Sequence, residues 1–265
     1  MIKKAIYKNG NNVEGKNDNF LCDSTENNSS TFQPFNRSTC KCFAFTLAEV
    51  LITLGIIGVV ASMTIPTLIQ NYKKKEAATR AKQAYSQISQ AIRLSEAENG
   101  EFASWDTAMS NNAKENTKLF FDKYLAPYFK GLKLCDSKVE VCGASLSSND
   151  VVYFFPNGTS VAFLVKPGAK MYVMIDVNGP KKPNILGRDN FYFKTDDTEQ
   201  KRLMPYGWFD GITREDVLRR GYTMYGDSRT MSCKKQADEE NELNRYGCTA
   251  LLMLDGWEMK DDYPW

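Results

Sequence analysis

Residues 43–69 read FAFTLAEVLITLGIIGVVASMTIPTLI, an apolar stretch with a single acidic residue, Glu49, near its start. At about 1.5 Å per helical residue the stretch is long enough to cross a hydrocarbon core of roughly 30 Å. A glutamate near the centre of a bilayer costs roughly 2.5–3.5 kcal/mol, whereas each Leu, Ile, Val or Phe favours insertion by about 0.3–0.6 kcal/mol. Thirteen such residues stand between Phe45 and Ile69. We therefore expect a membrane anchor rather than a cleaved secretory signal, whose apolar core is shorter.

Glu49 is the most informative residue of this stretch. An ionisable side chain within a membrane span indicates function by default, and a partner for it is expected. The alternative is a glutamate close enough to the membrane edge to reach headgroups and water by itself.

Residues 44–51, AFTLAEVL, resemble the processing and methylation motif of type IV prepilins and type II secretion pseudopilins. The resemblance implies that prepilin peptidase cuts between Ala44 and Phe45 and that the new amino group of Phe45 is N-methylated. Glu49 stands four residues after Phe45 and Pro66 stands twenty-one after it, where this family places a glutamate and a proline. Ala44 departs from the glycine that usually precedes the cut.

The resemblance also implies a role for the apolar helix, namely assembly into a pilus-like or secretion filament. The pKa of an α-amino group is about 7.7–8.0, so a newly formed Phe45 terminus is largely cationic and can neutralise Glu49 of a neighbouring subunit. Gly55, Gly58 and Ser62 permit close helix packing, and Pro66 removes a backbone hydrogen bond where pilin stems bend. Ordinary tolerance of Gly and Pro in membrane helices is the alternative for these residues.

Four segments are expected: a disordered leader over 1–44 that is removed, a transmembrane half-helix over 45–69, an exported amphipathic half-helix over 70–99, and a globular domain over 100–265. The leader holds six Lys or Arg and four Asp or Glu, so its removal from totals of 34 and 32 leaves 28 of each sign. A start codon assigned too far upstream is an alternative for so long a leader. The formally neutral mature chain predicts no specific nucleic-acid partner.

The expected location follows from the resemblance, because lysines on both sides of the span leave the charge rule undecided. Prepilins are single-pass proteins of the bacterial inner (cytoplasmic) membrane, with a cytoplasmic N-terminus, an exported C-terminal domain and, after assembly, an extracytoplasmic filament. The expected partners are prepilin peptidase, other pilin or pseudopilin subunits and the inner-membrane assembly machinery.

The chain contains no histidine, which removes His-based triads, general bases and metal ligands. No catalytic residue and no metal site is predicted, and the chain is expected not to be an enzyme. Two other functions remain open: a membrane-anchored extracellular binding protein or adhesin that never polymerises, and an anchored hydrolase.

Seven cysteines become four after the cut, since Cys22, Cys40 and Cys42 precede it. Four are compatible with two disulfides in an exported domain, or with reduced, buried thiols. Of three connectivities, the favoured one closes two short loops: Cys135–Cys142 and Cys233–Cys248.

Small and apolar residues continue at spacings of three and four after the span, which predicts one long helix from about Thr46 to Glu98, ended by Asn99-Gly100. The residues of this face are Ala77, Ala81, Ala84, Tyr85, Ile88, Ala91, Ile92 and Ser95. Residues 113–128 predict a short helix with Leu119, Phe120, Tyr124 and Leu125 inward. Residues 151–155 and 160–165, joined by Pro156-Asn157-Gly158-Thr159, predict a β-hairpin, and residues 171–177 a third strand.

These elements predict an α+β fold, with the long helix packed on a small antiparallel sheet, and the arrangement resembles the pilin-like roll. Asp176, Asn178 and Asp189 lie in turn-rich sequence, where either calcium binding or plain turn chemistry is expected; no other cofactor is predicted. Residues 248–257 predict a last strand, and Trp257 and Trp265 either core positions or partner anchors.

Overall fold

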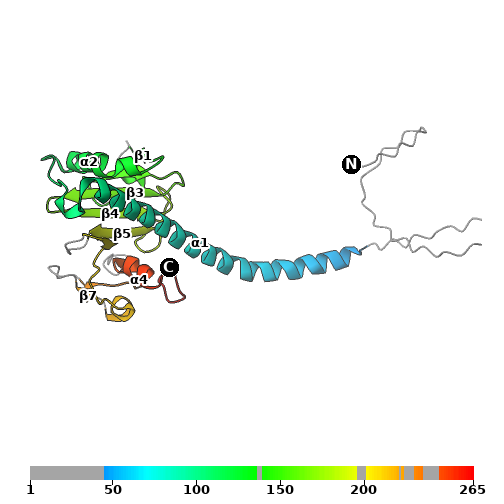
Figure 1. Ribbon diagram of the computed structural model, residues 1–265. Helices are drawn as coiled ribbons and strands as arrows, with labels where there is room; N and C mark the ends of the chain where they lie inside the picture. Colours follow the sequence, from blue (N-terminus) through cyan, green and yellow to red (C-terminus); the bar gives the residue numbers. More distant parts are fainter. Residues whose placement is uncertain (1–44, 136–138, 196–200, 221, 224–229, 235–244) are drawn as a thin grey trace, which may run out of the picture. The chain divides into compact units, whose positions relative to one another are not determined.

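The computed structural model describes residues 45–135, 139–195, 201–220, 222–223, 230–234 and 245–265. The predicted leader, including Ala44, lies outside these residues. The chain divides into two units, residues 1–64 and residues 65–265. Helix α1, Leu47–Asn99, begins in the first unit and ends in the second, and it continues without interruption through Pro66 (Figure 1).

The second half of α1, from residue 70 onward, buries the face that its periodicity predicts. The buried residues are Ala77, Ala78, Ala81, Ala84, Ile88, Ala91, Ile92 and Ser95, and Tyr85 is partly buried beside them. Small side chains along this face allow the helix to lie close to the sheet. The helix ends as predicted, because Gly100 adopts a φ of +79° and its N–H donates to the carbonyl of Glu96.

Six strands form one antiparallel meander in which every strand pairs with the next along the chain. They are β1 (Lys133–Leu134), β2 (Val151–Phe154), β3 (Ser160–Lys166), β4 (Lys170–Asp176), β5 (Asn190–Thr195) and β6 (Leu203–Pro205). The predicted hairpin and third strand are confirmed as β2, β3 and β4, and Gly158 in the hairpin turn has a φ of +84°. The strand β5 was not predicted, although its alternating burial places Phe191 and Phe193 inward.

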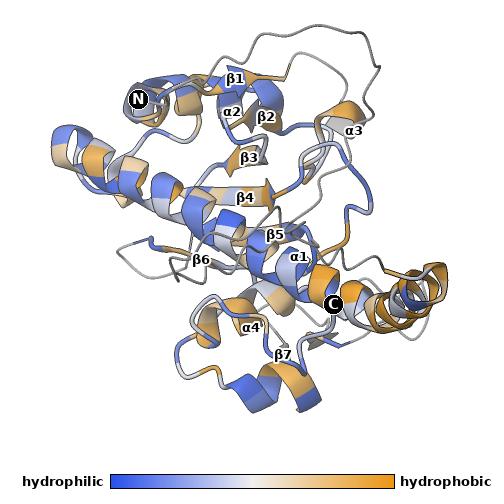
Figure 2. Ribbon diagram, turned by 90° about the vertical axis from the view of Figure 1, so that its right-hand side faces the viewer, coloured by the Kyte–Doolittle hydropathy of each residue, from blue (hydrophilic) through white to orange (hydrophobic). Residues whose placement is uncertain are grey.

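The main core lies between the sheet and the helices α1 and α2 (Ala113–Tyr124). Figures 1 and 2 show α1 running across the sheet. Phe121 of α2 stacks on Tyr153 of β2, with ring centroids 4.1 Å apart, and contacts Phe163 of β3. A smaller cluster covers the other face of the sheet, where Val152, Ala162 and Met174 pack against Cys142 and Ala144. The fold is therefore α+β, with a long N-terminal helix on an antiparallel sheet, and is consistent with the predicted pilin-like roll.

Short elements complete the described residues. They are the 3-10 turns η1 (Phe102–Ser104) and η2 (Ala126–Tyr128), helix α3 (Val139–Cys142), the π-helical turn η3 (Asp216–Arg220), the two-stranded sheet of β7 (Tyr222–Thr223) and β8 (Thr230–Met231), and helix α4 (Cys248–Leu254).

Two predictions are wrong in detail. Leu119 is 42% exposed, and Phe121 takes the inward position instead, since the apolar run 119–121 leaves the phase of the helix ambiguous. Residues 248–254 form helix α4 rather than a last strand, and Ala250, Leu251 and Leu252 are fully buried in it. Trp257 and Trp265 pack against the core, which agrees with the first of the two predicted alternatives, core positions rather than partner anchors.

Candidate functional site

The candidate site at the start of α1 is a capping box. One carboxylate oxygen of Glu49, Oε2, accepts from the backbone N–H of Thr46 at 2.9 Å and from its hydroxyl at 2.9 Å. The N–H of Glu49 donates in return to the Thr46 hydroxyl at 3.2 Å. These reciprocal bonds satisfy two backbone N–H groups that a helix start otherwise leaves unpaired.

This role of Glu49 was not predicted, although Thr46-x-x-Glu49 is the pattern of a capping box. The bonds use Oε2 alone, and within the described residues Oε1 accepts no hydrogen bond. Phe45, the residue before the cap, is 85% exposed. Phe45 and Glu49 thus lie within one helical turn of each other, with one carboxylate oxygen open to a further donor.

The apolar part of α1 carries its large side chains on the outside. Leu, Ile and Val residues from Leu47 to Ile69 are 41–77% exposed, and no heavy atom lies within 4 Å of a Cβ added at Gly55 or Gly58. Helix α1 is long and apolar enough to cross a membrane. Its surface is therefore suited to lipid or to other apolar helices, and the two glycines leave open positions for close approach.

Both predicted disulfides are confirmed. Cys135 is bonded to Cys142, at the edge of the smaller cluster, and Cys233 is bonded to Cys248, the first residue of α4. The alternative of reduced thiols is wrong for these four residues. Two disulfides in this domain are typical of a protein folded outside the reducing cytoplasm.

The predicted oxygen cluster is built into the connection between β4 and β5. The carboxylate of Asp189 accepts from the N–H groups of Asn184 and Ile185 and from the Asn178 side chain at 3.1 Å. Asp176 is fully buried, and its Oδ1 accepts from the N–H of Asn178 at 3.1 Å. The pKa of Asp176 is raised to about 8, mainly because the carboxyl is buried and also because Asp189 lies nearby.

These bonds are turn chemistry, in which the side chains organise the backbone around them. Among the residues that the structure describes, no group of three or more His, Cys, Asp or Glu is placed to hold a metal. Calcium at Asp176, Asn178 and Asp189 stays a prediction.

The C-terminal segment is held by buried polar contacts that the sequence did not reveal. The guanidinium of Arg245 donates to the carbonyls of Leu186 and Pro264, each at 2.8 Å. The hydroxyl of Tyr263 donates to the carbonyl of Gly187, and burial raises the pKa of this phenol. Gly187 has a φ of +74°, and a Cβ there would lie 2.3 Å from the Cβ of Cys248, so no other residue fits.

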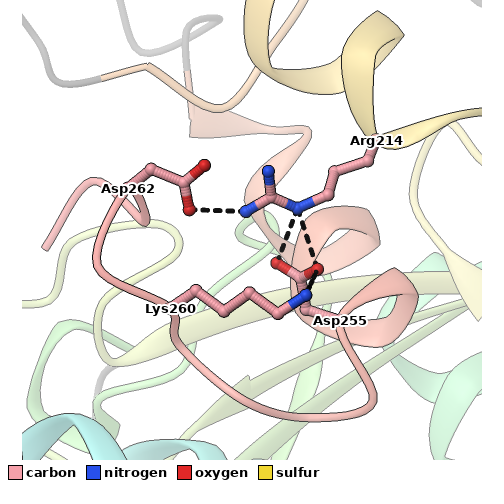
Figure 3. A network of polar contacts seen from close by, with 4 residues as sticks. All are labelled: Arg214, Asp255, Lys260 and Asp262. Carbon is pink, nitrogen blue, oxygen red and sulfur yellow. Dashed lines mark hydrogen bonds and ion pairs between the residues drawn. The ribbon is translucent and has the colours of Figure 1, made fainter.

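A second network joins this segment to the residues before η3 (Figure 3). The Nε–H of Arg214 donates to both carboxylate oxygens of Asp255, at 2.9 and 3.1 Å, and Lys260 donates to the same carboxylate at 2.7 Å. Arg214 also donates to Asp262 and thereby lowers the pKa of that carboxyl. The side chain of Asp255 is only 2% exposed, so its pairing with two cations compensates for the loss of water. No sequence pattern joins residues this far apart, and so none could have found either network.

The fold and the helix surface together define a class: an α+β domain whose N-terminal helix extends into an exposed segment able to cross a membrane. The chain belongs to a family of unknown function, DUF6613, whose model matches residues 67–265. That match begins directly after Pro66 and covers the domain but not the apolar segment before it. No curated protein and no solved structure matches the chain.

Proposed function

We propose that this protein is a pilin or pseudopilin, the structural subunit of a type IV pilus-like or type II secretion filament. In this proposal prepilin peptidase cuts between Ala44 and Phe45, Phe45 is N-methylated, and the apolar part of α1 packs against the same part of other subunits. The protein is structural rather than catalytic. Its partners are the peptidase, other subunits and the assembly machinery of the inner membrane.

The observation that carries the proposal is the arrangement of Glu49. A glutamate whose Oε2 caps its own helix and whose Oε1 is open can accept from the amino terminus of a neighbour without losing the cap. Because the carboxylate stands on an exposed apolar helix, an ammonium partner removes an unpaired charge from lipid when subunits assemble. The helix-on-sheet fold, the two disulfides and Pro66 within an unbroken helix also support a pilin-like subunit.

Two substitutions separate the cap from the charge. Glu49→Gln keeps an oxygen that can accept from Thr46, as glutamine also serves in a capping box, but it removes the charge. Glu49→Leu removes both. We expect both variants to insert and to be cut, and both to fail to enter filaments, measured as the filament fraction sheared from cells and by N-terminal mass analysis.

Threonine 46 supplies the matched control, because Thr46→Ala weakens the cap and leaves the carboxylate in place. Filament yield from this variant should stay near the wild-type level. Wild-type yield from Glu49→Gln would show that the charge is not needed and would refute the pairing. An uncut Ala44–Phe45 bond in the wild type would favour the anchored binding protein that never polymerises.

A further inference from the structure

A basic cavity of about 710 Å³ lies beside the exported half of α1, within the unit formed by residues 65–265. One wall is the α1 segment from Lys73 to Arg80, and another is the turn between β2 and β3, at Asn157 and Gly158. The connection between β4 and β5 and the ring of Trp265 complete it. It is thus built from four parts of the chain that are distant in sequence.

Five cationic side chains and two carboxylates line this cavity: Lys73, Arg80, Lys181, Lys182 and Arg188 against Glu76 and Asp189. Both carboxylates are already engaged. Glu76 pairs with Arg80 at 2.7 Å, and Asp189 accepts from backbone N–H groups and from Asn178. An unbalanced positive charge therefore remains in the cavity.

Of the five cations, the three lysines, Lys73, Lys181 and Lys182, are exposed and have no carboxylate partner in the described part of the chain. The other two are fixed in place. Arg80 donates to the carbonyl of Val177 at 3.2 Å, and the guanidinium of Arg188 lies 5.2 Å from the ring centre of Trp265. The cavity thus combines a rigid rim of two arginines and a tryptophan with three amines able to reach an anion.

The cavity is also close to the end of the apolar stretch along the same helix. Lys73 follows Ile69, the last residue of that stretch, by four residues, or about 6 Å along the helix. Tyr72, between them, is 66% exposed. Tyr, Trp and Lys are the side chains that gather at the headgroup level of a membrane, and basic residues next to a span attract anionic lipids.

We propose that this cavity binds the phosphate headgroup of an anionic phospholipid, with Lys73, Lys181 and Lys182 as the phosphate-binding amines. The headgroup enters beside Trp265, and its acyl chains remain with the apolar part of α1. The proposal rests on the membrane anchoring included in the proposed function, but not on cleavage or filament assembly. In this proposal the domain itself contacts lipid, in addition to the lipid contact made by the apolar part of α1.

The test uses the full chain in neutral detergent and monomeric short-chain lipids. Binding of short-chain phosphatidylglycerol, short-chain phosphatidylcholine and inorganic phosphate is titrated, and native mass spectrometry counts the lipid retained. The variant replaces Lys73, Lys181 and Lys182 by Gln. The control replaces three exposed lysines outside the cavity, Lys130, Lys133 and Lys170, by Gln, so that both variants lose the same charge.

We expect phosphatidylglycerol to bind well above phosphatidylcholine, and the cavity variant to bind it roughly 100-fold more weakly, since each lysine near a lipid surface contributes about 1 kcal/mol. The control variant should match the wild type. Circular dichroism and intact disulfides in the cavity variant show that a loss of binding is not a loss of folding.

Four results would overturn the proposal. Equal binding of the two lipids would show that the cavity is not a phosphate site. Full binding by the cavity variant would show the same. Inorganic phosphate binding as tightly as the lipid would indicate a free anion. Loss of self-association in the cavity variant, without lipid retention by the wild type, would assign the cavity to a second copy of the chain. A chain that is never cut at Ala44–Phe45 yet binds phosphatidylglycerol would sink the filament proposal alone.

Discussion

Asp176, at the end of β4, lies fully buried, with one carboxylate oxygen bonded to the N–H of Asn178 and the other without a hydrogen-bond partner among the residues that the structure describes. Its folded-state pKa of about 8 is above the ordinary value near 3.8, so the native state holds a proton that the unfolded chain releases. The contribution of this group to stability is therefore full below about pH 4 and falls as the pH rises toward 8.

Replacing Asp176 by Asn should flatten this dependence, since the amide keeps the acceptor for Asn178 and cannot ionise. Compared with the wild type, the variant should gain in relative stability as the pH rises from 4 to 8, measured as urea unfolding midpoints across that range. Asp210→Asn serves as control, because the Asp210 side chain is 80% exposed. Parallel pH profiles for the wild type and Asp176→Asn would show that Asp176 is ionised throughout.

Two residues show how far sequence reasoning reached at this scale. Glu49 was singled out by its charge in an apolar segment, but its hydrogen bonds to Thr46 were not foreseen. Gly187 lies in the turn-rich sequence between Asn178 and Asp189, but its need for a hydrogen in place of a side chain follows only from the approach of Cys248. Local patterns reveal a residue's type of role, whereas contacts between distant residues need the fold.

At the scale of elements, the two disulfides close short loops, and their contributions to the free energy of unfolding should differ slightly. Cys233–Cys248 spans fifteen positions and Cys135–Cys142 spans seven. By loop entropy, loss of the first should cost on the order of 3 kcal/mol and loss of the second about 2.5 kcal/mol.

Paired Cys→Ala variants test this expectation, with the free energy of unfolding taken from denaturant titrations. Addition of reductant to the wild type is the reference. Mass analysis with and without reductant checks the pairing, and a mass that reductant leaves unchanged would contradict both bonds.

The elements predicted best are those with a long or regular pattern. The face of α1 from Ala77 to Ser95 was correct because small residues recur over five turns, and the hairpin of β2 and β3 because Asn157-Gly158 marks its turn. Helix α4 was mistaken for a strand, since the short apolar run at residues 250–254 does not distinguish a helix from a strand by its period. Ala, Leu and Met have a preference for helices, and the burial of α4 against η3 and β5 adds to this preference.

At the scale of the whole molecule, the proposed topology places the domain outside the cytoplasm. The lysines after the span would by themselves favour the opposite orientation. The two orientations therefore give opposite expectations that one experiment can separate. Alkaline phosphatase fused after Trp265 should be active, and a cytoplasmic reporter at the same position inactive. The reverse pattern would refute export, and a fusion after Lys41 gives the matched control on the other side of the span.

The class of the fold could be predicted from sequence, because the long helix and the first strands carry local signals. The C-terminal third could not, since Arg245, Tyr263 and Asp255 are fixed by partners 19 to 76 positions away. The basic cavity could not be predicted for the same reason, because four separate segments of the chain form it.

The meander of the sheet has a consequence for how the chain is made. Because each strand from β2 to β6 pairs with its predecessor, every pairing becomes available as soon as the next strand has been made, with no need to wait for later sequence. The contact of Tyr263 with Gly187 instead needs 76 further residues after Gly187. Folding in the order of the chain would thus build the sheet first and close the segment around Tyr263 over it afterwards.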